Sequence, residues 1–158
     1  MAWTLGFVGC GVMAEVMIAG LLDEGLLPPE NIVASNRRGE RGETLKSQYG
    51  IRTTTDNRTV VAESDVVVLS VKPQNLSGVL EDLKGSLSPD TMVLSIVAGA
   101  SMRVLQVGLQ HERVARCMPN LPCRIREGMT VWAAPQNTEA TDVDRIEGIL
   151  GVMGGVIR

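Results

Sequence analysis

Two glycines and an alanine near the start of the chain have the spacing of a turn that binds the pyrophosphate of a dinucleotide, G-x-G-x-x-A. In such a turn the first glycine permits a tight bend, the second lets the backbone approach the pyrophosphate, and the alanine lets the next helix pack closely on the sheet. The unpaired N–H groups at the start of that helix face the anion. The motif consists of Gly9, Cys10, Gly11, Val12, Met13 and Ala14. A tight strand-to-helix turn that binds no ligand is the alternative.

A second polar segment, Ser35-Asn36-Arg37-Arg38, follows the next predicted strand. NAD enzymes usually carry Asp or Glu at this place for the ribose 2′-hydroxyl, and a carboxylate there would repel a 2′-phosphate. Two guanidiniums instead attract the phosphate and can bind it with two hydrogen bonds each. The segment therefore favours NADPH, with NADH bound more weakly, unless both arginines belong to a solvated loop.

A lysine follows the fourth predicted strand, in Val71-Lys72-Pro73-Gln74. Doubly wound sheets bind ligands at the carboxyl edge of their strands, so Lys72 is expected near the nicotinamide end. It could hold a substrate carboxylate or bond to the cofactor, which makes Lys72 the candidate catalytic residue. The alternative is a solvent-facing lysine before a helix.

Two further turns are predicted at the same edge. Ala98 and Gly99 follow the fifth strand and leave room for a ring to lie against the backbone. Pro119 and Asn120 follow the sixth strand, in a loop that two prolines hold extended.

Several other chemistries are disfavoured by composition. The three cysteines, Cys10, Cys117 and Cys123, form no CxxC pair, and the single histidine, His111, lies in a charged stretch, so no metal site is predicted. The net charge of -3 gives no positive field for nucleic acid. The odd number of cysteines without a zinc-binding spacing favours a reducing cytoplasm. No apolar run approaches the roughly 18 residues of a membrane span.

The elements that must position these residues alternate between strand and helix. Apolar runs predict strands at 3–9, 31–35, 51–54, 65–71, 91–97, 113–117 and 128–134, and helical spacing predicts helices at 12–24, 39–48, 75–83 and 101–109. A last helix is expected to be capped by Thr141 and closed by Gly154 and Gly155, with residues 156–158 opening one more strand. Such alternation predicts an α/β fold with a doubly wound parallel sheet, the Rossmann fold.

Several sequence blocks resemble the pyrroline-5-carboxylate reductases. They occur in that family's order and spacing over nearly the whole chain, and generic Rossmann enzymes would be expected to share only the first. The blocks are Gly6 to Ala14, Val71 to Gln74, Ser95 to Gly99, and Arg116 to Asn120 followed by Pro122 and Glu127 to Thr130.

The resemblance implies an NADPH-dependent reduction of 1-pyrroline-5-carboxylate to L-proline by a homo-oligomeric enzyme. It places Ser35, Asn36 and Arg37 around the adenosine phosphate and Asn57 against the cofactor. It also places Val71, Lys72 and Pro73 at the reacting end, and has Ala98, Gly99, Pro119 and Asn120 frame the nicotinamide pocket. Family members continue into a helical substrate and dimerisation domain. We therefore expect residues 1–158 to be an NADP-binding domain without that second domain, and to be inactive alone.

Two other functions remain open from the sequence. A β-hydroxyacid dehydrogenase-like oxidoreductase would share the glycine motif and an arginine after the second strand, although the VKPQ and MPNLP blocks favour the reductase. A non-catalytic NADP-binding module belongs to a different class, and an assay for proline formation beside a cofactor titration separates it from the enzyme.

Overall fold

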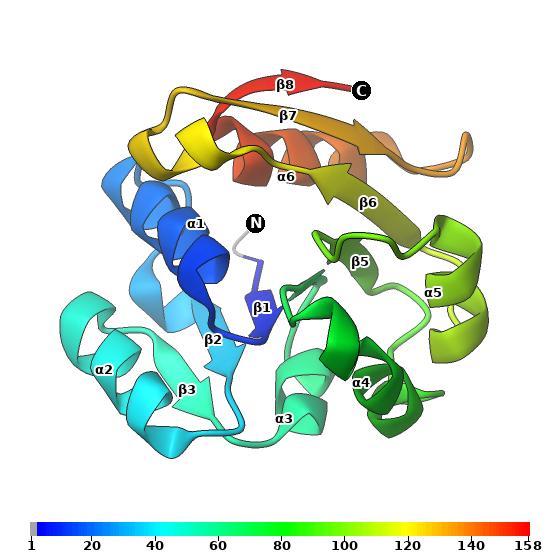
Figure 1. Cartoon of the computed structure of the whole chain (residues 1–158), viewed down its shortest axis with the longest axis horizontal. Coiled ribbons are helices and arrows are strands. Elements are labelled where there is room, and N and C mark those ends of the chain that lie inside the picture. Colours follow the sequence, from blue (N-terminus) through cyan, green and yellow to red (C-terminus); the bar gives the residue numbers. More distant parts are fainter. Residues whose placement is uncertain (1–2) are drawn as a thin grey trace.

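The computed structural model describes residues 3–158, whose strands form one sheet in the order β3-β2-β1-β4-β5-β6-β7-β8 (Figure 1). The order reverses between β1 and β4, because β1 pairs with β2 on one side and with β4 on the other. This reversal is the topological switch point of a doubly wound sheet. The strands are β1 (Leu5–Val8), β2 (Ile32–Ser35), β3 (Arg52–Thr54), β4 (Val66–Leu69), β5 (Met92–Ser95), β6 (Val114–Met118), β7 (Gly128–Ala133) and β8 (Gly154–Ile157).

Helices cover both faces of the sheet, as continuous apolar strands require. They are α1 (Val12–Asp23), α2 (Gly39–Tyr49), α3 (Asn57–Ala62), α4 (Leu76–Leu83), α5 (Met102–Leu109) and α6 (Ala140–Gly151), and short 3-10 turns lie at η1 (Pro29–Asn31), η2 (Pro73–Asn75) and η3 (Leu121–Ile125). Among residues 3–158 no helix has the length and apolar character that crossing a bilayer requires.

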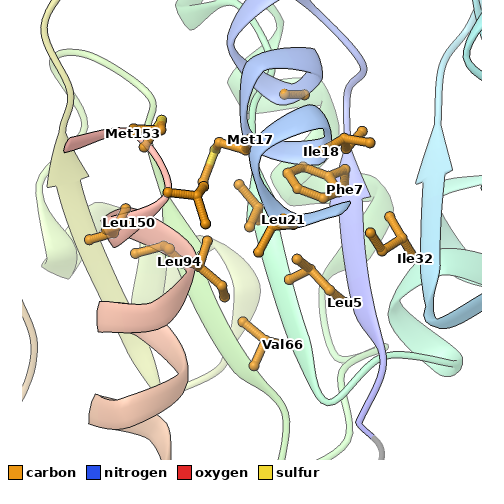
Figure 2. Packing of buried hydrophobic residues seen from close by; sticks show 14 of the residues in the cluster. Leu5, Phe7, Met17, Ile18, Leu21, Ile32, Val66, Leu94, Leu150 and Met153 are labelled. Carbon is orange, nitrogen blue, oxygen red and sulfur yellow. The ribbon is translucent and has the colours of Figure 1, made fainter. Parts of the chain in front are cut away.

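The core is divided by the sheet into two clusters. On one face, α1, α2 and α6 pack around Leu5 and Phe7 of β1. Figure 2 shows Ile18 and Leu21 of α1 beside these strand residues, and Met17 pointing toward Leu150 of α6. On the other face, α3, α4 and α5 cover a second cluster that contains Val8 and Val67. Since all four residues of β1, β2, β4 and β5 are buried, these strands form a rigid base for the loops at their carboxyl ends.

The doubly wound fold is confirmed, but the sheet is not wholly parallel. β7 runs antiparallel to β6, with Cys117 opposite Trp132. A parallel return needs a crossover of a dozen or more residues, and the segment between Met118 and Gly128 is too short to supply one. This segment contains η3 where the sequence predicted only an extended loop.

Two local predictions near the end of the chain were wrong, and one short helix in its middle was missed. Thr141 lies inside α6, which begins one residue earlier at Ala140. Gly154 and Gly155 do not close that helix but begin β8, where Gly154 has φ +127° and a Cβ would lie 2.2 Å from the Gly128 oxygen. The short helix α3 was not predicted at all.

Candidate functional site

Most residues of the first half of the chain that were predicted to bind the cofactor or the substrate meet at the switch point between β1 and β4. The loops that follow β1, β2 and β4 enclose a cleft of about 460 Å³, which we call the switch-point cleft. It is lined by Gly9, Cys10, Gly11, Ser35, Asn36, Arg37, Arg38, Asn57, Ser70, Val71, Lys72, Asn75 and Val79.

The turn between β1 and α1 consists of residues 9–11, and we call it the fingerprint turn. Its two glycines have different roles. Gly9 has φ +95°, and a Cβ there would lie 2.9 Å from the carbonyl oxygen of Ser70. Gly11 has an ordinary φ of -73° and a Cβ there would meet no atom within 4 Å, so the backbone at Gly11 borders open space. No side chain caps the start of α1. An exposed backbone and an uncapped helix start fit a pyrophosphate.

A chain of hydrogen bonds runs from the lining of the cleft to α4. The buried Ser35 hydroxyl donates to Asn57 Oδ1 at 2.7 Å, and Asn57 Nδ2 donates to Asp82 Oδ2 at 3.2 Å. Both polar ends of the Asn57 side chain are therefore engaged within the protein. The Ser70 hydroxyl donates to the Gly9 carbonyl at 2.6 Å, which joins the fingerprint turn to the end of β4.

Three cations line the cleft without a carboxylate partner in the described part of the chain. Arg37, Arg38 and Lys72 are exposed, and none of them forms an ion pair within residues 3–158. Asn36 Oδ1 accepts the Arg38 N–H at 3.1 Å and holds the loop that carries both arginines. The cleft is therefore electropositive and fits an anionic ligand.

Cys10 lies in the fingerprint turn, but it is a packing residue rather than a nucleophile. Its thiol is buried and donates to the Ser35 carbonyl at 3.0 Å. Burial raises the pKa of the Cys10 thiol to about 11, against the opposing effect of Arg41. The thiolate, which is the reactive form, is therefore scarce at neutral pH.

Eight of the predicted site residues lie outside the lining of this cleft: Val12, Met13, Ala14, Pro73, Ala98, Gly99, Pro119 and Asn120. Ala14 is fully buried where α1 packs on the sheet. Ala98 and Gly99 follow β5, and Pro119 and Asn120 follow β6, so these two pairs lie one and two strands further along the same edge. Asn120 Oδ1 accepts the Met129 N–H at 3.0 Å, so it also fixes the loop onto β7. The roles of these residues stay predictions.

Sequence reasoning missed several residues at the site. Ser70, Asn75 and Val79 line the cleft. Ser70 was hidden inside the predicted strand 65–71, whereas β4 ends at Leu69 and leaves Ser70 in the loop. Arg41 donates from Nε to the Cys10 carbonyl at 2.9 Å. No sequence motif predicts this contact, because it depends on how α2 packs beside α1.

A larger cavity, of about 560 Å³, lies at the opposite edge of the sheet, beside the amino ends of β5 and β6. Arg113 lines it and is already paired with Glu139 at 2.9 Å and with the buried Asp142 at 2.6 Å. The ring of His111 bonds to the Thr91 carbonyl at 2.6 Å. No predicted site residue borders this cavity, and its one arginine is already paired with two carboxylates, so size alone does not make it the functional site. Within residues 3–158 no group of three or more His, Cys, Asp or Glu side chains is arranged to hold a metal ion.

Comparisons with known proteins also indicate an oxidoreductase domain that binds NADP. The family model described as "NADP oxidoreductase coenzyme F420-dependent" matches residues 4–99. A pyrroline-5-carboxylate reductase of Synechocystis sp. is 36% identical over 157 residues, which is 99% of this chain and 58% of that protein.

Solved structures give the same picture. A pyrroline-5-carboxylate reductase of Coxiella burnetii superposes with a TM-score of 0.93 at 31% identity, covering 99% of this chain and 58% of that one. A pyrroline carboxylate reductase of Plasmodium falciparum with NADP bound gives a TM-score of 0.83 at 24% identity, covering 98% and 56%, and supports the fold. The chain thus spans less than two thirds of the length of these proteins.

Proposed function

We infer the function from the premise that this chain belongs to the family described as NADP oxidoreductase, coenzyme F420-dependent, which it matches over residues 4–99. The resemblance to pyrroline-5-carboxylate reductases is confirmed over almost the whole chain. The family description names NADP, the cofactor that Arg37 and Arg38 predict.

We propose that residues 1–158 are the NADPH-binding domain of an enzyme that reduces 1-pyrroline-5-carboxylate to L-proline. The observation that carries the proposal is the switch-point cleft, where an open backbone at Gly11 lies beside Arg37 and Arg38, which form no ion pair within residues 3–158. The α1 start would hold the pyrophosphate and the two arginines the 2′-phosphate.

The reacting end is assigned to the loops after β4, β5 and β6. NADPH, when bound, supplies a hydride, and reducing a cyclic imine to an amine consumes that hydride and one proton. In this proposal Lys72 would attract the carboxylate of the substrate. Ala98, Gly99, Pro119 and Asn120 would frame the side where the ring lies. The contribution of these residues is orientation and exclusion of water, and no side-chain nucleophile is required.

The substrate, the partners and the location of the whole protein are also proposals. The relatives are longer than this chain, and we propose that their additional length completes the substrate pocket and forms a homo-oligomer. The three cysteines are free thiols buried in the described structure, which suits a reducing cytoplasm.

The proposal is tested by following NADPH oxidation with and without 1-pyrroline-5-carboxylate. Residues 1–158 should bind NADPH but reduce the imine poorly, because half of a substrate pocket gives little orientation, and orientation supplies roughly 7 to 11 kcal/mol of barrier lowering. A full-length chimera, in which this chain replaces the matching part of a relative such as the Synechocystis protein, should reduce the imine. If the full-length chimera binds NADPH yet forms no proline, the domain is a binding module and the assignment as a reductase is wrong.

A further inference from the structure

A carboxylate lies in the first turn of the helix whose start is proposed to face the pyrophosphate. Glu15 belongs to α1, and its backbone N–H donates to the Gly11 carbonyl at 3.1 Å. The positive end of a helix attracts any nearby anion, whether a carboxylate of the chain or a phosphate of a ligand. An uncompensated Glu15 would therefore weaken the field that the pyrophosphate needs.

Two residues of α2 bind that carboxylate, and one of them, Arg41, carries the opposite charge. Arg41 forms an ion pair with Glu15 Oε2, and the Tyr49 hydroxyl donates to Glu15 Oε1 at 3.1 Å. The hydrogen bond from Arg41 holds the pKa of Glu15 below its usual value, so the carboxylate is ionised and paired. The same guanidinium donates from Nε to the Cys10 carbonyl at 2.9 Å. One side chain thus contacts both the fingerprint turn and the acid beside it.

Arg41 also joins the two anion-binding segments of the proposed site. The helix that carries it, α2, begins at Gly39, directly after the Asn36 to Arg38 loop. We propose that Arg41 is a positioning residue for NADP(H): it neutralises Glu15 and fixes the Cys10 carbonyl, so that the start of α1 stays electropositive and the turn keeps its shape. The inference rests on the proposed cofactor function and adds a residue that does not line the cleft.

A double-mutant cycle tests the proposal by calorimetric titration of NADPH and NADH into four chains: the wild type, Arg41→Ala, Glu15→Gln and the double variant. Arg41→Ala should weaken the binding of both cofactors about tenfold, a loss equal to one charged interaction. The ratio of NADPH to NADH affinity should stay unchanged because both cofactors contain the pyrophosphate. Glu15→Gln in the Arg41→Ala background should restore much of that loss. Glu15→Gln alone should bind NADPH at least as tightly as the wild type.

Arg52 provides a matched control, because it has the same pair of contacts far from the cleft. Its Nε donates to the Glu30 carbonyl at 2.9 Å and its Nη1 pairs with Glu63 at the amino end of β3. Arg52→Ala should lower the melting temperature but leave both dissociation constants unchanged.

The outcomes separate this inference from the proposed function. If the wild type binds neither cofactor, both fail. If it binds NADPH and Arg41→Ala binds equally well, or if removing Glu15 in either background weakens binding further, the positioning role of Arg41 is overturned. Glu15→Gln alone keeps the test decisive if Arg41→Ala does not fold.

Discussion

Replacing Gly11 by alanine should separate cofactor binding from folding. Gly11 has φ -73° and ψ -171°, a conformation open to any residue, and a Cβ there meets no atom within 4 Å. The N-cap preference for glycine over alanine and the lower entropy of the unfolded alanine chain act in opposite directions, each with a magnitude of about 0.4 to 1 kcal/mol. The free energy of unfolding should therefore change by less than about 1 kcal/mol.

The loss in free energy of NADPH binding should be much larger than the change in the free energy of unfolding. The open space beside Gly11 is where we propose that the pyrophosphate contacts the backbone, and a methyl group there would hold it away from the N–H groups of α1. Losing one charge-assisted hydrogen bond costs about 1.5 to 3 kcal/mol, which corresponds to a loss of roughly 10- to 150-fold in NADPH affinity.

Gly9→Ala is the control, since its structural situation is the opposite. Gly9 has φ +95°, and its Cβ would lie 2.9 Å from a backbone oxygen, so this variant should lose about 1 to 3 kcal/mol of stability. Urea unfolding and calorimetry on both variants measure the two effects. The reasoning is refuted if Gly11→Ala is destabilised as much as Gly9→Ala, or if it binds NADPH as tightly as the wild type.

Four further predictions follow from the same site. Arg37→Ala should lower the ratio of NADPH to NADH affinity by roughly 10- to 150-fold in calorimetry, and an unchanged ratio here and in Arg38→Ala would exclude the arginines as 2′-phosphate ligands. In the full-length chimera proposed above, Lys72→Ala should reduce turnover more than it reduces binding of an adenosine 2′-phosphate fragment, and the reverse ranking would place Lys72 at the wrong end. Because burial raises the pKa of Cys10 to about 11, mass spectrometry should find it alkylated at pH 8 only after unfolding. Glu15 has a folded pKa below its ordinary value of 4.5, so its stabilising effect is complete above pH 4.5 and is lost as the pH falls through the folded pKa. Between pH 5 and 3, Glu15→Gln should therefore lose less stability than the wild type does.

The strands and the fingerprint turn were predictable because each depends on local sequence. Val66–Leu69 is a continuous apolar run, and all four residues are buried, as a strand covered on both faces must be. The G-x-G-x-x-A spacing places a turn between strand and helix, and Gly9 and Gly11 occupy that turn. The meeting of Ser35 to Arg38 with Lys72 in one cleft follows from the switch-point rule once the strand order is known. Asn57 lines the same cleft, but only the family resemblance predicted it there.

Features that depend on tertiary contacts were not predictable. α3 spans only Asn57–Ala62, too short for a clear helical period. The local sequence around Gly154 is typical of a helix terminator. In the fold, Gly154 lets β8 approach the backbone of Gly128 in β7, and these two strands meet only after folding. The contact of Arg41 with the Cys10 carbonyl has no local signal either, since 31 residues separate the two in sequence.

Parallel calorimetric titrations of residues 1–158 with NADPH and NADH test the central claim most directly, because they ask only whether the switch-point cleft binds the predicted cofactor. We predict saturable binding of one NADPH per chain, with NADH weaker by roughly 10- to 150-fold, since NADH lacks the 2′-phosphate that Arg37 and Arg38 would bind. Absence of saturable NADPH binding to the folded chain, or equal affinity for NADH, would contradict the account.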